Sequence, residues 1–332
     1  MSAKVPTDVT AGTTRFRFDV IMTAPRLAAP AVAVLEAAGC RIHYMPPYPS
    51  AAMVAALARE VAAHAILSRQ GPVDAAAMDA SPNLRIVARH GVGVDDVDIA
   101  AAKARGIMVT RAPGSNTTAV AEHTLALILA LAKDLRPLGA TIAAGGWRGA
   151  AGQVRDIAGL RLGLLGFGAI GRAVARLALA FGMEVTACDP RAAPMQGVCL
   201  VATPAGLWPV ADVLSLHCPY LPATRHVVDA AALAALPPGA CVINTARGGL
   251  IDEPALAAAL DQGQLAGAAL DVFETEPPGA DDPLRNHPRV VVTPHVAGVT
   301  PHSLDAMGTM AAECIAAHLS GAAVPPERIV SP

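Results

Sequence analysis

Short apolar runs alternate with longer segments of helical periodicity along most of the chain. Strands that alternate with helices at this spacing predict a parallel α/β sheet. We expect the first such unit to begin at Phe18 and to be complete by about Thr110. Its predicted strands read FDVIMTA, CRIHYM, AILS, LRIVAR and IMVT, and its first two helices are predicted over 27–38 and 51–63.

A second series of the same kind begins near residue 162. Its apolar runs start at 162, 184, 212, 241, 266 and 290, so we expect six parallel strands, the number of a doubly wound dinucleotide-binding domain. The turn sequence RAPGSN predicts a boundary at 111–116, and an apolar helix is predicted over 119–133. A helix over 300–319 is expected to return to the first unit, because the second sheet is already complete at Thr293.

The stretch from Leu162 to Asp189 has the pattern of a strand, a glycine turn, a helix and a second strand. In such a turn the first glycine permits the bend, the second admits a pyrophosphate, and the third lets the helix pack close to the strand. The phosphates would rest on the helix N-terminus. Asp189 would accept from a ribose 2′-OH and repel a 2′-phosphate, which favours NAD over NADP; a purely structural turn is the alternative. The turn reads Gly166-Phe167-Gly168-Ala169-Ile170-Gly171.

Length, charge and cysteine spacing narrow the class of protein. The 332 residues suffice for about two domains, and a net charge of −2 with a pI near 6.5 gives no electrostatic reason to expect nucleic acid or an anionic membrane as partner. The longest apolar run, 124–132, is far shorter than the roughly 20 residues that span a bilayer. The first 20 residues contain no apolar signal core, so we expect a cytoplasmic protein. The six cysteines form no CxxC pair, which disfavours disulfides and a metal site.

Polar residues follow the predicted strands of the second series directly. Ligands bind beyond the carboxyl ends of the strands in open parallel sheets, so we expect these residues to converge where a nicotinamide would lie. A cation to hold a carboxylate, a histidine to donate a proton and a carboxylate beside that histidine are what hydride reduction of a 2-keto acid requires. The residues alone leave open which of two glutamates is used. The set is Arg247, Asp271, Glu274, Glu276 and His295.

Seven segments, in order along nearly the whole chain, carry a family resemblance. They are RHGVGVDDVD (89–98), APGSNTTAVAEHTLALILAL (112–131), LLGFGAIG (164–171), SLHCP (215–219), INTARGGLIDE (243–253), ALDVFETEPP (269–278) and TPHVAG (293–298). Together they resemble the D-isomer-specific 2-hydroxyacid dehydrogenases, a group that includes phosphoglycerate dehydrogenases and hydroxypyruvate/glyoxylate reductases. The resemblance implies a homodimer that forms through its nucleotide domain.

The resemblance also implies an architecture and a catalytic set. Two Rossmann-like doubly wound domains are expected, with an NAD-binding domain at 112–298 inserted into a discontinuous substrate-binding domain at 1–111 plus 299–332. Arg247 would bind the substrate carboxylate and polarise its carbonyl. His295 would protonate the carbonyl oxygen as hydride arrives. The family pattern selects Glu276, directly before a proline, as the partner that favours protonated His295, and leaves Glu274 solvated.

Further positions match the family's cofactor and substrate contacts. Asp271 resembles the residue that binds the nicotinamide carboxamide, with a helix N-cap as the alternative. Arg69 is a softer match to a substrate-side arginine of phosphoglycerate dehydrogenases, and a surface role is as good an interpretation. Cys218 is expected to make a backbone contact and not to act as a nucleophile. The other matched positions are His217, Pro219, Thr245 and Ala246 for the cofactor, and Val92 and Gly93 for the substrate carboxylate.

The sequence therefore predicts an NAD-dependent D-2-hydroxyacid dehydrogenase that moves a hydride between nicotinamide and C2 of a small 2-hydroxy or 2-keto acid. 3-Phosphoglycerate with phosphohydroxypyruvate is one candidate pair, and Arg69 would suit an anionic substrate of that kind. A hydroxypyruvate or glyoxylate reductase is an alternative. A non-catalytic NAD(H)-sensing binding protein is another, because corepressor relatives of the family can retain the Arg/Glu/His set.

Overall fold

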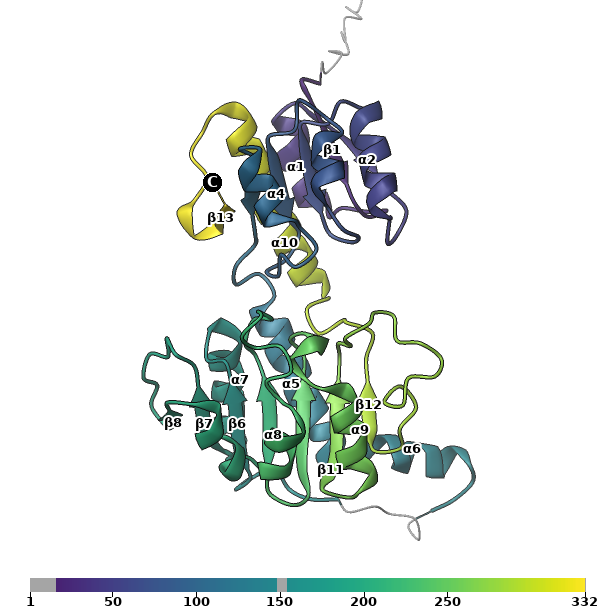
Figure 1. The fold of residues 1–332 in the computed structure, drawn as a ribbon, viewed down its shortest axis with the longest axis vertical. Coiled ribbons are helices and arrows are strands. Elements are labelled where there is room, and N and C mark those ends of the chain that lie inside the picture. The colour runs from purple at the N-terminus through teal and green to yellow at the C-terminus, as the bar shows by residue number, and fades with distance from the viewer. Residues whose placement is uncertain (1–15, 148–153, 332) are drawn as a thin grey trace, which may run out of the picture. The chain divides into compact units, whose positions relative to one another are not determined.

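The computed structural model describes residues 16–147 and 154–331. Residues 1–15, which make up most of the segment behind the expectation of a cytoplasmic location, lie outside this described part. The chain divides into two compact units, one formed by 1–115 with 301–332 and the other by 116–300. Both are α/β units built on a mainly parallel sheet (Figure 1).

The first unit has a six-stranded sheet in the order β13-β5-β4-β3-β1-β2. Its first five strands are parallel, and the 2-1-3-4-5 order is a doubly wound arrangement whose direction reverses between β1 and β3. The last strand, β13, pairs antiparallel with β5 and was not predicted. The strands are β1 (Phe18–Met22), β2 (Cys40–Tyr44), β3 (Ala65–Ser68), β4 (Ile86–Arg89), β5 (Met108–Thr110) and β13 (Ile329–Ser331).

Helices cover both faces of this sheet. On one face, α1 and the long helix α10 pack over Val20, Leu67 and Ala88; on the other, α2, α3 and α4 pack over Ile66 and Val87. Alternate residues of each strand thus enter opposite cores, as expected for a sheet buried on both sides. The helices are α1 (Ala29–Ala37), α2 (Ala51–Glu60), α3 (Ala75–Asp79), α4 (Ile99–Ala104) and α10 (Pro301–Ser320).

The second unit has a seven-stranded, entirely parallel sheet in the order β12-β11-β10-β9-β6-β7-β8. The prediction of six strands was therefore wrong, because it missed the edge strand β8 (Val198–Val201). Its four residues are all at least partly exposed, so they lack the buried apolar pattern that identifies a central strand. The others are β6 (Arg161–Leu165), β7 (Glu184–Cys188), β9 (Val213–Leu216), β10 (Ala240–Asn244), β11 (Leu265–Leu270) and β12 (Val290–Val292).

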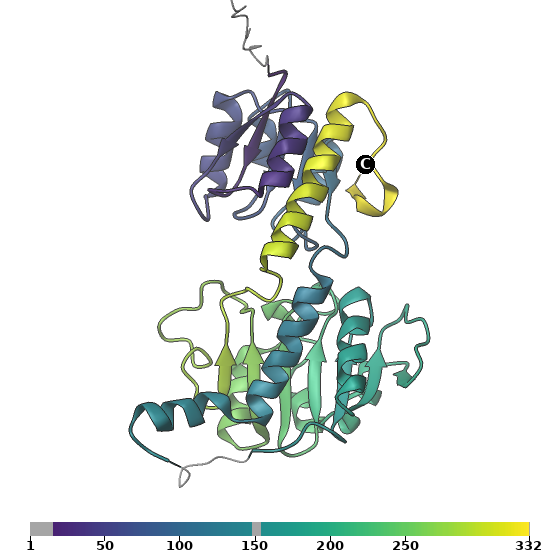
Figure 2. The same ribbon diagram turned by 180° about the vertical axis from the view of Figure 1, so that it is seen from behind.

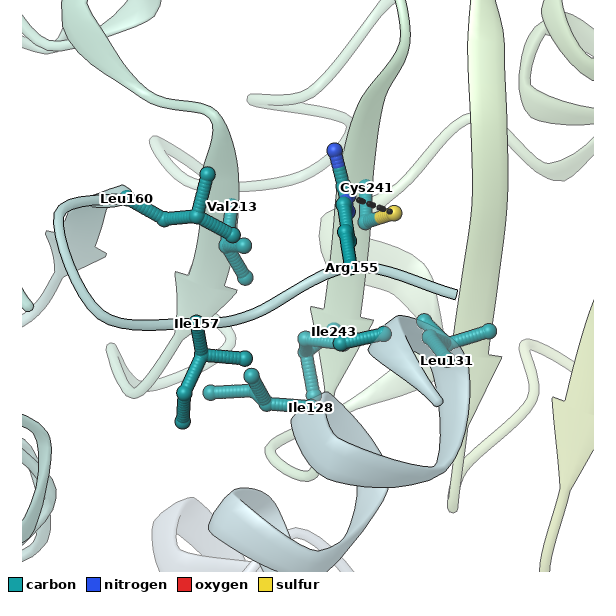
Figure 3. A pocket seen from close by; sticks show the side chains of 9 residues that line it. Ile128, Leu131, Arg155, Ile157, Leu160, Val213, Cys241 and Ile243 are labelled. Carbon is teal, nitrogen blue, oxygen red and sulfur yellow. Dashed lines mark hydrogen bonds between the residues drawn. The ribbon is translucent and has the colours of Figure 1, made fainter. Parts of the chain in front are cut away.

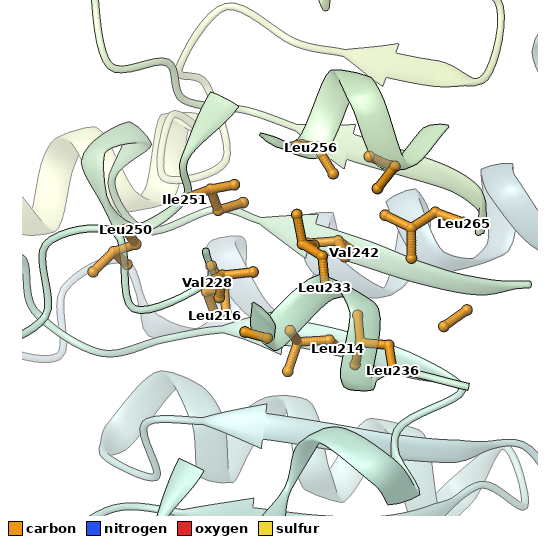
Figure 4. Packing of buried hydrophobic residues seen from close by; sticks show 14 of the residues in the cluster. Leu214, Leu216, Val228, Leu233, Leu236, Val242, Leu250, Ile251, Leu256 and Leu265 are labelled. Carbon is orange, nitrogen blue, oxygen red and sulfur yellow. The ribbon is translucent and has the colours of Figure 1, made fainter. Parts of the chain in front are cut away.

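Two cores enclose this second sheet. Figure 1 looks onto the face covered by α8 and α9, and Figure 2 onto the face covered by α5 and α7. Figure 4 shows the first of these cores, in which Leu233 and Leu256 from the two helices meet Leu214 and Val242 of the sheet. The helices are α5 (Thr117–Ala132), α6 (Leu135–Ala143), α7 (Ala169–Ala180), α8 (Ala230–Ala235) and α9 (Glu253–Asp261).

Across residues 16–147 and 154–331, no helix has the combination of length and apolar character that crossing a bilayer demands.

Candidate active site

In the glycine turn between β6 and α7, Gly168 faces open space, whereas Gly166 and Gly171 are closely packed. A Cβ at Gly166, whose φ is +97°, would lie 2.5 Å from the Cys218 amide nitrogen, and one at Gly171 would lie 2.3 Å from the Gly166 carbonyl oxygen. A Cβ at Gly168 would meet nothing within 4 Å. Gly168 is also the N-cap of the twelve-residue α7, whose first amides are free to bind an anion. This cradle fits the pyrophosphate of NAD.

Asp189 follows β7 at the same edge of the sheet. Its Oδ2 accepts from the Phe167 amide at 2.9 Å and its Oδ1 from the Arg191 amide at 2.8 Å. The carboxylate therefore orders the glycine turn from the neighbouring strand. Its acceptor capacity is not exhausted by two bonds, so it still suits a ribose hydroxyl.

The loop after β9 lies directly across from the glycine turn. The His217 amide donates to the Leu165 carbonyl at 2.7 Å, and its Nε2 lies 2.9 Å from Ser215 Oγ. Burial raises the pKa of the Cys218 thiol to about 11, so the thiolate needed for nucleophilic attack is not populated near neutral pH. Since β6 and β9 flank the point where the strand order reverses, this loop and the glycine turn occupy the position where doubly wound sheets bind ligands.

His295 and Glu276 form a hydrogen-bonded pair in the second unit. His295 Nδ1 lies 2.7 Å from Glu276 Oε2, and Glu276 Oε1 accepts from the Phe273 amide at 3.1 Å. Burial raises the pKa of the Glu276 carboxyl. The hydrogen bond and charge of His295, the Phe273 amide and the charge of Arg247 outweigh that effect, so the net pKa lies below the ordinary value. Glu276 is therefore an anion at neutral pH.

Glu274 does not compete for this histidine. Its Oε1 lies 3.1 Å from His226 Nε2 and 3.8 Å from Arg225 Nη2. The expectation that Glu274 is merely solvated was incomplete, because the side chain has these two partners. The structure places Glu276, and not Glu274, beside His295.

Arg247 is half-buried in the turn after β10. Its Nη1 donates to the Ala246 carbonyl at 2.6 Å, and its own carbonyl accepts from Asn244 Nδ2 at 2.8 Å. Asn244 Oδ1 also accepts from the Ala246 amide at 3.0 Å. Thr245, in the middle of this turn, is buried. The turn is thus fixed by one buried asparagine, which leaves Arg247 close enough to act electrostatically on Glu276.

Asp271 is only 1% exposed and is not a helix N-cap. Its Oδ1 accepts from the Val296 amide at 2.9 Å and from Thr293 Oγ1 at 2.5 Å, and its Oδ2 accepts from the Ala297 amide at 2.9 Å. The carboxylate therefore organises the loop that contains His295. Whether it also meets a carboxamide stays a prediction.

The predicted substrate residues of the first unit lie at the carboxyl edge of its own sheet. Thr23 Oγ1, just after β1, accepts from the Arg69 amide at 2.8 Å, which places Arg69 at the reversal between β1 and β3. Arg89 Nη1 donates to the Arg69 carbonyl at 2.7 Å and its Nε donates to the Gly93 carbonyl at 2.8 Å. One guanidinium therefore ties the Arg69 loop to the loop of Val92 and Gly93.

Thr23, Arg89 and Asn244 were not singled out from the sequence. Each is the polar residue that ends an apolar strand or follows it directly. That position is a usable signal, since the carboxyl edge of a parallel sheet is where such side chains reach neighbouring loops.

A small pocket lies elsewhere, near the amino ends of β9 and β10 (Figure 3). Ile128, Ile157 and Val213 line it, and Arg155 Nη2 donates to Cys241 Sγ at 3.1 Å. It leaves no volume that a water molecule could enter. Burial raises the pKa of the Cys241 thiol despite the nearby guanidinium. This pocket is a packing gap in the core, distant in the fold from the carboxyl edge.

Comparison with known proteins agrees with this geometry. A sequence model described as "D-isomer specific 2-hydroxyacid dehydrogenase, NAD binding domain" matches residues 125–297. That range falls entirely within the second unit and contains the glycine turn, Arg247, Glu276 and His295.

Two curated relatives show the same identity but different coverage. The chain is 43% identical over 267 residues to D-3-phosphoglycerate dehydrogenase of Mycobacterium leprae, covering 79% of this chain and 50% of that protein. It thus spans about half the length of that relative. It is also 43% identical over 242 residues to (S)-sulfolactate dehydrogenase of Chromohalobacter salexigens, covering 72% of this chain and 78% of that protein.

Among solved structures, the TT0316 protein of Thermus thermophilus superimposes with a TM-score of 0.87 at 35% identity, over 94% of this chain and 99% of that chain. This likeness confirms the predicted fold class, with two Rossmann-like parallel-sheet domains. The sequence resemblance is confirmed as well. The chain belongs to the D-isomer specific 2-hydroxyacid dehydrogenase family, and residues 125–297 form its NAD-binding domain.

Proposed function

We propose that this chain is an NAD-dependent D-2-hydroxyacid dehydrogenase, which moves a hydride between nicotinamide and C2 of a small 2-hydroxy or 2-keto acid. The observation that carries the proposal is the His295–Glu276 pair, 2.7 Å apart, with the charge of Arg247 acting on the same carboxylate. An acid, its partner and a cation on neighbouring loops match what the chemistry requires.

When bound, NAD supplies the hydride chemistry at its nicotinamide ring. The amides at the start of α7 and the open space at Gly168 would hold the pyrophosphate, and Asp189 would accept from the ribose. Asp271 organises the loop of residues 293–297 and would bind the nicotinamide carboxamide.

The chain's own residues then hold the substrate and move one proton. Arg247 binds the substrate carboxylate and polarises the carbonyl. Because His295 Nδ1 faces Glu276, its Nε2 is the atom that gives a proton to the carbonyl oxygen during reduction and takes it back during oxidation. Glu276 orients the imidazole through this hydrogen bond.

The first unit is proposed to bind the rest of the substrate. Val92 and Gly93 offer backbone amides to the carboxylate, and Arg89 fixes that loop through the Gly93 carbonyl. Arg69 is proposed to bind a second anionic group. The pKa of the Arg69 guanidinium lies below its ordinary value, mainly because the group is partly buried. Tyr48 opposes this shift, and the charge of Arg26 adds to it.

The positive charge of Arg26 acts on Arg69, and two cations that lie this close favour an anionic ligand. Within the described residues, neither Arg26 nor Arg69 has a carboxylate partner. The two curated relatives are named for phosphoglycerate and sulfolactate, which carry a phosphate or a sulfonate beside the carboxylate. A substrate of that class, such as 3-phosphoglycerate with phosphohydroxypyruvate, is therefore the finer proposal.

The test is NADH oxidation by the purified chain with a panel of 2-keto acids. Phosphohydroxypyruvate and sulfopyruvate are compared with hydroxypyruvate, glyoxylate and pyruvate. We expect kcat/KM to be highest for the two doubly anionic acids and to fall by roughly tenfold or more for them alone in Arg69→Met. A preference for glyoxylate or hydroxypyruvate, unchanged in Arg69→Met, would favour the reductase alternative.

We further propose a homodimer. Helix α6 has no buried residue, yet Arg136 anchors it by donating to the carbonyls of His287 and Val290. Leu135, Ile142 and Trp147 are 57, 55 and 72% exposed on and beside this helix, which suits an interface. Light scattering should give twice the chain mass of 33.6 kDa, and Leu135→Glu with Ile142→Glu should give the single mass. A wild-type monomer would contradict the proposal.

A further inference from the structure

His123, near the start of α5, belongs to a hydrogen-bonded chain that the proposed mechanism does not use. Its Nε2 lies 3.1 Å from Thr293 Oγ1, just after β12, and 3.7 Å from Asp271 Oδ1, just after β11. Thr293 Oγ1 donates to Asp271 Oδ1 at 2.5 Å. Three elements far apart in sequence therefore meet at one buried carboxylate.

Counting protons gives the donor and the acceptor of each hydrogen bond in this network. A threonine hydroxyl has one proton, and here it points to the Asp271 carboxylate. Thr293 Oγ1 can then only accept from the imidazole, so His123 Nε2 carries a proton and donates it. His123 thus supplies a donor to a side chain that in turn satisfies Asp271.

The hydrogen-bonded network that starts at His123 ends at the loop that contains His295. Asp271 accepts from the Val296 and Ala297 amides through its carboxylate and from the His295 amide, at 2.7 Å, through its carbonyl. His295 itself has φ +53°, a left-handed conformation that is uncommon for a residue other than glycine. Such a conformation persists only when the surroundings hold it. Asp271 accepts from the amides of three successive residues here, and the Thr293 carbonyl also accepts from the His295 amide at 3.1 Å.

The same helix reaches a second loop of the proposed site. Thr124, the neighbour of His123, is buried, and its Oγ1 lies 3.0 Å from Thr245 Oγ1 in the turn before Arg247. Helix α5 packs against β10, β11 and β12, on the face seen in Figure 2. Two successive residues of α5 therefore contact the loops that carry the two proposed catalytic side chains.

We propose that His123 is a positioning residue for the proposed dehydrogenase reaction: through Thr293 and Asp271 it holds residues 293–297 in the turn that keeps His295 against Glu276. The proposal rests on the proposed function for its kinetic consequence. It extends that function by a second histidine, which acts on the geometry of His295 and does not touch the reacting atoms.

The kinetic test compares three variants with the wild type on its best keto acid. In His123→Leu the donor is lost while an apolar group fills the site, and we expect kcat to fall on the order of 10- to 100-fold, with KM for the keto acid and for NADH within about twofold. His123→Gln, whose side-chain amide can donate in place of Nε2, should recover most of the loss. His287→Leu is the matched control, because His287 Nε2 also lies near a carboxylate, 3.3 Å from Asp261, in the same unit.

A second readout does not depend on turnover. Amide hydrogen exchange of the peptide that contains residues 293–298 should be faster in His123→Leu than in wild type, and unchanged in His287→Leu. If the wild type turns over none of the keto acids, the proposed function fails, while this exchange measurement still decides whether His123 positions the loop.

Three results would overturn the proposal. One is an unchanged kcat together with unchanged exchange in His123→Leu. Another is an equal loss in His287→Leu, which would indicate general destabilisation. The third is a His123→Gln variant as impaired as His123→Leu, which would show that the donated proton is not what matters.

Discussion

His295 Nδ1 lies 2.7 Å from Glu276 Oε2, and this contact leaves Nε2 as the nitrogen for proton transfer. The carboxylate is anionic at neutral pH because its hydrogen bond to His295 and the nearby positive charges outweigh the effect of burial on its pKa. The orientation of the proposed acid thus comes from one neighbour, so Glu276 is the residue to mutate first.

Replacing this carboxylate by an amide should impair the proton transfer more than the binding of either substrate. We expect Glu276→Gln to lower kcat on the order of 10²-fold. KM for the keto acid and for NADH should change little, because Glu276 is proposed to orient His295 and not to contact either substrate. Glu274→Gln is the control, since Glu274 pairs with His226 instead. A wild-type kcat in Glu276→Gln would remove the residue from this role.

The glycine turn offers two substitutions with opposite expectations. Gly171→Ala would place a methyl group 2.3 Å from the Gly166 carbonyl oxygen, so we expect it to lower the free energy of unfolding by roughly 1–3 kcal/mol or more. Gly168→Ala meets open space and should lower the free energy of unfolding less, by about 1 kcal/mol for an alanine at the N-cap of α7. It should also weaken NADH binding, because the new methyl group would stand where the pyrophosphate approaches. Urea unfolding and NADH fluorescence titration separate the two, and tight NADH binding by Gly168→Ala would argue against the cradle.

Asp189 should set the preference between the two dinucleotides. Asp189→Asn keeps an acceptor for the Phe167 amide but removes the charge that repels a 2′-phosphate. We expect the ratio of NADPH to NADH dissociation constants to move at least tenfold toward NADPH. Asp156→Asn, which breaks an exposed pair with Lys133, is the control. An unaltered ratio would show that Asp189 does not contact the ribose.

His90 makes the first unit sensitive to acid. Burial, reinforced by the charges of Arg69 and Arg89 and partly opposed by a backbone hydrogen bond, lowers the pKa of its imidazole to about 4. The unfolded chain, with the ordinary value of 6.5, binds the proton first. Stability is therefore lost as pH falls from 6.5 to about 4, by roughly 3 kcal/mol from this group.

Urea unfolding of wild type and His90→Gln at pH 7 and pH 4.5 measures this contribution. The stability of the variant should depend less on pH over this interval. His302→Gln, at an exposed position, should behave as the wild type. Equal acid sensitivity of His90→Gln and wild type would contradict the assignment.

The central strands could be read from the sequence because they are apolar and buried on both faces, as in Leu164 and Leu165 of β6, which enter the two opposite cores. Strands β8 and β13 could not, since each is a short strand at the edge of its sheet. Their formation depends on the neighbour they pair with more than on their own apolar pattern.

The candidate site likewise contains residues that the sequence could single out and residues that it could not. Motif order singled out Arg247, Glu276 and His295 as candidates, and Glu276 and His295 lie 2.7 Å apart in the structure. The supporting contacts of His123 and Arg89 join residues whose separation in sequence says nothing of their distance in the fold. His123 also lies in an apolar helix, where a histidine without a visible partner has no readable role.

The most direct test of the account follows the hydride itself. NADH carrying deuterium at both C4 positions of the nicotinamide is incubated with the protein and its best keto acid, and the product is analysed by mass spectrometry and chiral chromatography. We expect a D-2-hydroxy acid with one deuterium at C2 from the wild type, and none from His295→Asn, although that variant should still bind NADH. Tight NADH binding by the wild type without deuterium transfer to any keto acid would contradict the account and favour an NAD(H)-sensing protein.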